Sequence, residues 1–398
     1  MTSAPPPIPD VDAPEPPDHA EDSGSVDLSP GLKERLTGRD WLAVAPLRIA
    51  AAVGIPLVGF FLLLLTFTFL RDSDANRLTI VAVALVAGVG GVFALYWGMD
   101  FVNNQLPERI AARIRPWIFV GPALSVLALF LVWPTIRTVW LSFLDDDGEA
   151  YVGIANYEFA FTDNLMLTAF RNNVIWLIVG TFFTVGLGLL IATLVDKLRR
   201  RAETVAKSVI FLPMAISFVG AAVVWSFIYA FRPEGRPQIG LLNAIWTALG
   251  GSPIAWLQQE PWNNLLLIVV LVWLQTGFTM VILSAAIKGV PDDILEAARI
   301  DGASEIQVFW RVVIPTIQST IVVVTTTMII LILKVFDIVW VMTSGDFGTE
   351  VIASQMIRQA FRFFDNGKGA AIAVILLLAV IPVMVLNIRR FREEEALR

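Results

Sequence analysis

Eight apolar runs, each close to the length that a helix needs to cross a bilayer, most constrain the fold of this 398-residue chain. About 20 helical residues span the ~30 Å hydrocarbon core, where every backbone polar group must find its partner within the protein. The runs therefore predict an all-α integral membrane protein with eight transmembrane helices. They cover residues 48–70, 78–98, 117–143, 174–195, 207–231, 264–287, 316–341 and 369–388.

The composition supports a membrane location and excludes several kinds of site. Only 16% of the residues are charged, against about 25% in an average soluble domain. The chain has no cysteine, and its one histidine, His19, lies in a Pro-rich segment. Disulfide frameworks, thiol or imidazole metal sites and imidazole triads are therefore excluded. We expect no catalytic and no metal-binding residue.

Residues 1–46 are rich in proline and acidic residues. Such a segment cannot bury enough apolar surface to offset its chain entropy, so we expect a disordered cytoplasmic tail. A polyproline docking motif at residues 5–7 is the alternative, but no basic residue flanks it.

The distribution of lysine and arginine predicts which loops face the cytoplasm. Basic residues gather in alternate loops, whereas Asp145, Asp146 and Asp147 make an intervening loop acidic. With an even number of spans, both termini are then cytoplasmic, as is the loop between the sixth and seventh runs. The basic residues are Arg109, Arg113, Arg115, Lys197, Arg199, Arg200, Arg201, Lys207, Arg389, Arg390 and Arg392.

The loop between the sixth and seventh runs, residues 291–315, has the pattern of two short helices joined by a turn. Pro291 suits a first helical turn, and Gly302 suits the left-handed residue that ends that helix. Ser304 and Gln307 form a capping-box pattern for the second helix. Ala297 and Ala298 leave a side-chain-poor strip for a partner to approach. An ordinary helical loop is equally compatible with these features alone.

The segment EAARIDGASEIQVFWRVVIP resembles the EAA signature of ABC-importer permeases. Its matching positions are Glu296, Ala297, Ala298, Gly302, Ile314 and Pro315. Val312 and Ile314 are mild departures, since isoleucine and leucine are usual there. Further stretches, including FLPMAISFVGAAVVW and KVFDIVWVMTSG, extend the similarity over about residues 115–395. The likeness is to the carbohydrate branch, especially to α-glucoside permeases of the maltose type.

This resemblance implies a six-helix permease core over residues 115–398, preceded by two additional helices within residues 47–114. It implies that the loop is a coupling helix docked on a separate ATPase pair, which binds ATP and magnesium, while this chain binds no cofactor. It also implies a second permease subunit, an extracytoplasmic sugar-binding protein and the plasma membrane of a prokaryote. The implied substrates are sugars such as maltose, trehalose or related oligosaccharides; another carbohydrate or a polyol, for example of the glycerol phosphate type, is the alternative.

The two additional helices are interpreted as lipid-facing scaffold, with a partner-binding flank as the alternative. Gly88, Gly90 and Gly91 in the second helix would allow close helix contact.

Polar residues within the apolar runs are candidates for the substrate path, because burying them in a membrane is costly. Lys334 and Asp337 lie one helical turn apart in the seventh run and could neutralise each other. A structural ion pair and a position near the sugar route are the two interpretations. Gln275 and Phe278, three residues apart in the sixth run, combine an amide with a ring that could stack on a sugar. The resemblance places them at sugar-contacting positions.

Trp225 and Tyr229 share one face of the fifth run and form either a second stacking face or an interfacial anchor. Two other classes of protein are disfavoured. A proton-coupled transporter needs a fuller titratable relay than Lys334 and Asp337, and a membrane enzyme needs acids, bases or metal ligands at one level. The chain has no G-x-x-x-x-G-K-[ST] phosphate loop, so it does not hydrolyse ATP alone.

Overall fold

The computed structural model describes residues 54, 57–73, 75–104 and 108–396; the predicted tail and His19 lie outside them. Within these ranges the elements are helical, and the one isolated β-bridge joins Leu144 to Tyr151. The all-α fold class is confirmed. The chain divides into two compact units, Met1–Ala128 and Leu129–Arg398.

In the first unit, a helix over residues 57–72 precedes α2 (Arg77–Asn104) and α3 (Glu108–Leu127). The ring of Tyr96 stacks on Phe119 with 6.3 Å between centroids. A Cβ on Gly91 would lie 3.7 Å from Leu63, whereas Gly88 and Gly90 face open space. Only one of the three glycines therefore makes the close contact that the sequence predicted.

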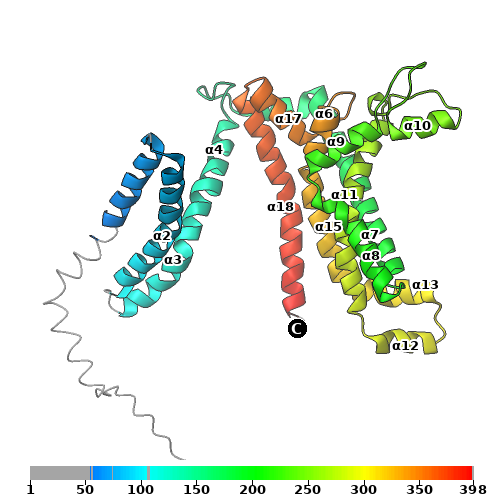
Figure 1. Ribbon diagram of the computed structural model, residues 1–398, viewed down its shortest axis with the longest axis horizontal. Coiled ribbons are helices and arrows are strands. Elements are labelled where there is room, and N and C mark those ends of the chain that lie inside the picture. The colour runs from blue at the N-terminus through cyan, green and yellow to red at the C-terminus, as the bar shows by residue number, and fades with distance from the viewer. Residues whose placement is uncertain (1–53, 55–56, 74, 105–107, 397–398) are drawn as a thin grey trace, which may run out of the picture. The chain divides into compact units, whose positions relative to one another are not determined.

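The second unit is a helical bundle (Figure 1). This unit begins at Leu129, whereas the permease core was predicted to begin at residue 115. The predicted boundary of the core stays a prediction. Its elements are η1 (Ala128–Val132), α4 (Trp133–Leu141), α5 (Ala155–Thr162), α6 (Asn164–Ile175), η2 (Trp176–Gly180), α7 (Thr181–Val195), α8 (Arg200–Phe211), η3 (Leu212–Ala215), α9 (Phe218–Ile228), α10 (Leu241–Ala248), η4 (Trp256–Gln258), α11 (Trp262–Lys288), α12 (Asp292–Ile300), α13 (Glu305–Val308), η5 (Phe309–Val313), α14 (Ile314–Thr316), α15 (Gln318–Leu333), α16 (Asp337–Met342), α17 (Ile352–Ile357), η6 (Arg358–Arg362) and α18 (Asn366–Ala396).

Among the described residues, five helices are long and apolar enough to cross a membrane, and two bent helix pairs raise the number to seven. The first predicted span begins at residue 48, outside the described ranges, so the eight-helix count is not confirmed. The five helices are Arg77–Phe101, Phe119–Leu141, Asn164–Val195, Trp262–Lys288 and Asn366–Arg389, and the pairs are Arg200–Ala215 with Phe218–Ile228 and Glu305–Thr316 with Gln318–Leu333.

Two predicted spans differ from the structure for local reasons. The fourth begins at Asn164, ten residues before its predicted start, because the Asp163 carboxylate accepts hydrogen bonds from Leu165 and Met166 and caps a polar first turn. The fifth is bent by 99°. There Ser217 starts a new helix by accepting a hydrogen bond from the amide of Gly220.

Helix α11 is the central helix of the second unit. The main core cluster packs its residues, among them Leu267 and Leu271, against side chains of η2, α9, α15 and α16. Two glycines bring neighbouring helices close to it. A Cβ on Gly188 of α7 would overlap Thr279, and a Cβ on Gly277 would overlap the backbone of Ile210 in α8.

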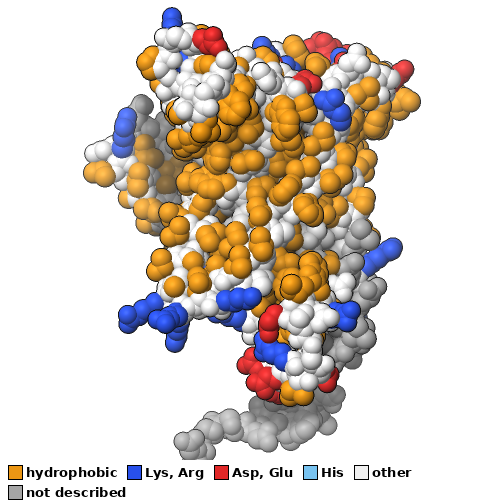
Figure 2. Space-filling view, turned by 90° about the vertical axis from the view of Figure 1, so that its right-hand side faces the viewer, with side chains coloured by type: hydrophobic (Ala, Val, Ile, Leu, Met, Phe, Trp, Pro, Cys, Tyr) orange, Lys and Arg blue, Asp and Glu red, His pale blue; other side chains and the backbone are white. Residues whose placement is uncertain are grey.

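The surface pattern matches that of a membrane protein. In the face shown in Figure 2, hydrophobic side chains form a broad band, and charged side chains gather at its two edges. Figure 1 places the loop with α12 and α13 at one end of the bundle and α6, α10 and α17 at the other.

Candidate functional site

The loop between α11 and α15 has the architecture that the sequence predicts. Gly302 has φ +84°, a left-handed conformation that glycine adopts without steric cost. Ser304 and Gln307 form the predicted capping box: the Gln307 side chain accepts from the Ser304 amide at 2.8 Å, and the Ser304 hydroxyl accepts from the Gln307 amide at 3.4 Å. Pro291 is the N-cap, one position before the predicted first turn.

The helical path of the second helix continues through Pro315. This proline lies in α14, directly after the π-helical turn η5. A proline lacks an N–H and its ring clashes with the carbonyl four residues earlier, and a π turn accommodates both effects. The chain bends only after Pro315, where α14 and α15 meet at 71°.

An apolar cluster fixes this loop to the bundle. Val290, Val308, Val313 and Ile317 are buried together, and Leu189 of α7 packs against them. Such contacts are not directional, so they hold the loop without a unique hydrogen-bonded geometry.

The two alanines of the loop have different surroundings. Ala298 packs against the apolar cluster, whereas Ala297 and Glu296 are exposed. The small-residue strip is therefore narrower than predicted.

The loop also exposes large apolar side chains that the sequence pattern did not single out. Ile300 is 85% exposed and Ile306 is 73% exposed. The sequence does carry a signal for them: apolar residues flank the turn at Gly302, where a solvent-exposed loop would favour polar residues. They are the apolar part of the surface around Glu296.

The structure leaves Gln275 and Phe278 on neighbouring positions of α11. Gln275 is 6% exposed, and within the described ranges its amide has no hydrogen-bond partner. Phe278 is half-buried and packs against the main core cluster. An amide without a partner in an apolar helix has unused capacity to bind a ligand.

Trp225 and Tyr229 belong to the bundle interior. Their ring centroids are 5.3 Å apart, and Trp225 also meets Trp273 edge-on at 5.7 Å. The Tyr229 hydroxyl donates to the carbonyl of Leu266 at 3.1 Å. Since Tyr229 is buried, this structure supports neither an interfacial anchor nor an open stacking face there, although the buried Trp225 Nε1 lacks a partner in the described part of the chain.

Lys334 and Asp337 do not lie on one continuous helix, which corrects the prediction. Helix α15 ends at Leu333, and α16 begins at Asp337 after a break in which Phe336 has φ −144°. Among the described residues, no ion pair within 4 Å joins Lys334 to Asp337, and Lys334 is exposed.

A cluster of charges that the sequence reasoning missed joins the ends of α7, α8 and α11. Lys207 donates to Asp196 at 3.1 Å and to Glu203 at 2.6 Å. Ser284 donates to Asp196 at 2.6 Å, and Lys288 pairs with Glu203. This cluster lies at the end of α11 that leads directly into the loop.

At the opposite end of the bundle, asparagines hold the loop over residues 343–351. Asn172 of α6 donates to the carbonyls of Gly348 at 2.7 Å and Glu350 at 2.8 Å. Asn263 and Asn264 of α11 donate to Phe347 at 2.6 Å and Gly348 at 3.2 Å. The adjacent Asn pairs at the starts of two apolar runs, residues 172–173 and 263–264, are the signal by which this clamp could have been found.

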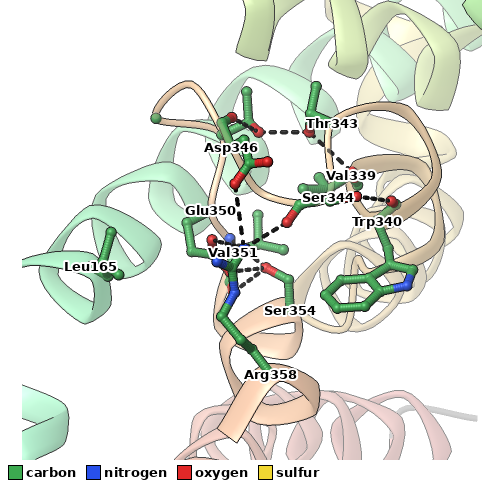
Figure 3. Close-up of polar contacts among 12 residues, drawn as sticks. Leu165, Val339, Trp340, Thr343, Ser344, Asp346, Glu350, Val351, Ser354 and Arg358 are labelled. Atoms are coloured by element: carbon green, nitrogen blue, oxygen red, sulfur yellow. Dashed lines mark hydrogen bonds and ion pairs between the residues drawn. The ribbon is translucent and has the colours of Figure 1, made fainter. Parts of the chain in front are cut away.

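A buried ion pair completes this loop (Figure 3). The carboxylate of Glu350, which is 2% exposed, lies 3.0 Å from Arg358 and accepts from the Ser354 hydroxyl at 2.7 Å. Arg358 also donates to the carbonyl of Ser344 at 2.6 Å. Burial raises the pKa of the Glu350 carboxyl, while Ser354 and Arg358 act in the opposite direction.

The family described as "Binding-protein-dependent transport system inner membrane component" matches residues 184–390, just over half of the chain. The chain belongs to this family. The match includes the loop at α12 and α13, so the permease resemblance seen in the sequence is confirmed. The protein is a multi-pass inner-membrane component of a transporter.

Two relatives of the permease align over nearly their whole length. The osmoprotective compounds uptake permease protein GgtC of Synechocystis sp. is 59% identical over 71% of this chain and 100% of its own. The alpha-glucoside transport system permease protein AglF of Rhizobium meliloti is 46% identical over 80% of this chain and 98% of its own.

The fold also has a solved counterpart. A chain in the crystal structure of a bacterial ABC transporter involved in the import of the acidic polysaccharide alginate is 22% identical, with a TM-score of 0.61 over 71% of the permease and 99% of that chain. At this identity the comparison shows a shared fold.

Proposed function

We propose that the permease is the membrane-spanning subunit of an ATP-driven importer for sugars, with α-glucosides such as maltose and trehalose as substrates. The similarity to AglF over 98% of that protein carries the proposal. The name of the 59% identical Synechocystis relative favours small osmoprotective compounds as a second substrate class. Uptake of labelled maltose and trehalose by the reconstituted importer tests it, and absence of uptake for both contradicts it.

The loop at α12 and α13 is proposed to dock on a separate ATPase pair, which binds ATP and magnesium. Glu296 supplies a carboxylate and Ile300 an apolar contact on its exposed side. Glu296→Gln and Ile300→Ala should each lower ATPase co-purification and sugar-stimulated hydrolysis, since they remove surface contacts without touching the apolar cluster. Asp301→Asn, exposed next to Ile300, is the control; normal stimulation in both variants would reject the docking role.

A second permease subunit and an extracytoplasmic sugar-binding protein are the other proposed partners. The permease supplies one loop of this kind, residues 291–315, here called the coupling loop, and an ATPase pair offers two docking positions. A related transporter has been solved with an alginate pentasaccharide-bound periplasmic protein, which supports a similar partner here. Co-purification of both proteins with the tagged permease tests this assembly.

The proposed topology has eight spans and cytoplasmic termini. Arg200 and Arg390 then face the cytoplasm and Asp146 faces outward. Because the chain has no cysteine, single cysteines introduced at these positions can be labelled without background. Labelling of position 200 from outside intact cells would contradict the topology.

Gln275 and Phe278 are proposed to line the sugar path. Gln275→Ala and Phe278→Ala should assemble normally but transport sugar more slowly or with altered preference, because a neutral hydrogen bond or a ring contact contributes about 1 kcal/mol. Thr327→Ala, exposed on α15 with its hydroxyl bonded only to its own helix, is the control. Unchanged uptake kinetics and preference in both variants would remove these residues from the path.

A further inference from the structure

A cavity of about 390 Å³ lies at the end of the bundle opposite the coupling loop. Its walls include Thr168 and Arg171 of α6, Glu260 before α11, Asp346 and Phe347 of the clamped loop, and Arg358. This volume lies within the range of ~300–1,000 Å³ that small-molecule sites occupy.

The cavity floor is preorganised. The asparagine clamp fixes the backbone carbonyls of Phe347 and Gly348, and Thr349 donates to the carbonyl of Asp346 at 2.7 Å. Gly348 has φ +70°, and a Cβ there would overlap the Glu260 carboxylate. The absence of a side chain at Gly348 therefore lets the Glu260 carboxylate lie close to the loop. Because the backbone of the loop is already fixed, a ligand would bind without having to order it.

Several polar groups on the walls have unused binding capacity. Arg358 makes its hydrogen bonds through Nη2, and its buried Nε lacks a partner among the described residues. Arg171 makes one bond, of 3.4 Å, to Asn172. The Asp346 carboxylate is 3.8 Å from Arg358, too far for a hydrogen bond.

The chemistry of the walls suits a neutral ligand with many hydroxyl groups. Guanidinium groups only donate hydrogen bonds and carboxylates only accept them, whereas a hydroxyl does both. Two arginines and three acidic residues line one small space, so neither a strongly anionic nor a strongly cationic ligand is favoured. Phe347 adds an aromatic face that is 49% exposed and held at φ +55°, a conformation that a phenylalanine rarely adopts.

We infer that this cavity is a sugar-binding site at the mouth of the permease, distinct from the path residues Gln275 and Phe278. The inference rests on the proposed sugar import. Gln275 lies 11 residues after Asn264 along α11, a separation of about 17 Å at ~1.5 Å per residue. The cavity would hold the glycoside before it reaches the level of Gln275, and it would contribute to the choice among sugars.

The test uses the complete importer in liposomes at saturating sugar-loaded binding protein. Phe347→Ala, Phe347→Leu and Arg171→Gln are compared with wild type for the ratio of maltose to trehalose uptake. We expect Phe347→Ala and Arg171→Gln to change the ratio by about two- to tenfold, as loss of one ring or hydrogen-bond contact predicts. Phe347→Leu, which keeps an apolar side chain, should change it less.

Two matched controls lie outside the cavity lining. Phe364→Ala removes another exposed phenylalanine with positive φ, and Arg236→Gln neutralises another exposed arginine. Both should keep the wild-type ratio. When the concentration of sugar-loaded binding protein is varied, the concentration that gives half-maximal uptake should be the same in all variants.

An unchanged sugar ratio in both Phe347→Ala and Arg171→Gln would overturn the inference. So would a half-saturating concentration of binding protein that rises equally for both sugars, since that result identifies a protein-contact surface. If Gln275→Ala alters uptake while the cavity variants do not, the proposed function stands and the cavity inference falls. A wild-type importer that takes up neither sugar contradicts the proposed function before any substitution is made.

Discussion

The two ends of the permease bundle hold their loops by different physical means. At one end, asparagine amides and a buried ion pair fix the backbone over residues 343–351 through directional hydrogen bonds. At the other, an apolar cluster holds the coupling loop, and its charges face solvent. Directional bonds specify one geometry, whereas apolar contact tolerates small shifts. The difference suits a fixed cavity at one end and the proposed docking loop at the other.

The largest expected effect comes from breaking the buried ion pair at the clamped end. Arg358→Met leaves the Glu350 carboxylate buried and unpaired, which costs about 3–5 kcal/mol. The yield and thermal stability of the purified complex should fall sharply, and adding Glu350→Gln should recover part of the loss. Arg362→Met, at an exposed position of the same π turn, should behave as wild type. Equal stability of Arg358→Met and Arg362→Met would show that the pair is dispensable.

The amide clamp should be the next most sensitive feature. Asn172→Ala removes the side-chain donor to the buried Glu350 carbonyl and one of the two amide donors to the Gly348 carbonyl. Loss of a donor to a buried carbonyl costs about 1–3 kcal/mol. Thermal aggregation of the complex should begin at a lower temperature than for Asn164→Ala, an exposed position on the same helix. If the two variants begin to aggregate at the same temperature, directional hydrogen bonds do not stabilise this end of the bundle more than the other.

At the coupling end, the turn should matter more than any single contact. Gly302→Val places a β-branched residue in the left-handed region, at a cost of about 1–2 kcal/mol. The local strain should reduce sugar-stimulated ATPase activity while the complex still assembles. Gly302→Asn, which tolerates that conformation, is the control; full stimulation in the valine variant would mean that the turn geometry is not needed.

The capping box offers a finer test of the same loop. Ser304→Ala removes a cap worth ~1 kcal/mol in typical helices, and the 3.4 Å bond here places the expected effect at the low end. Faster amide hydrogen exchange at Gln307 would report the loss. Thr316→Ala, whose hydroxyl bonds to Val312 without capping a helix start, should not change that exchange.

The smallest effect is expected at Lys334. The side chain is exposed and unpaired with Asp337 in the structure, so Lys334→Ala should leave the yield of folded complex unchanged. A defective Lys334→Ala variant that is rescued by Asp337→Ala would instead support the ion pair that the sequence suggested.

The sequence predicted the features that depend on local rules. Hydropathy located most of the spans, and the turn at Gly302 and the box at Ser304 followed from backbone and capping preferences. It failed where tertiary structure decides. The break between Leu333 and Asp337 interrupts an apolar run without proline or glycine, so periodicity could not reveal it. The cavity joins residues from α6, the segment before α11 and the loop before α17, which only the fold brings together.

Helix α11 begins at the asparagine clamp and ends at Lys288, directly before the turn at Gly289 that leads into the coupling loop. Its 27 residues span about 40 Å, and close packing at Gly188 and Gly277 leaves no room for it to slip past α7 and α8 locally. Because these contacts lie near the middle of α11, a tilt that moves one end of the helix moves the other end in the opposite direction. The cavity and the proposed docking loop therefore lie at opposite ends of one continuous helix, so a tilt of that helix would move both.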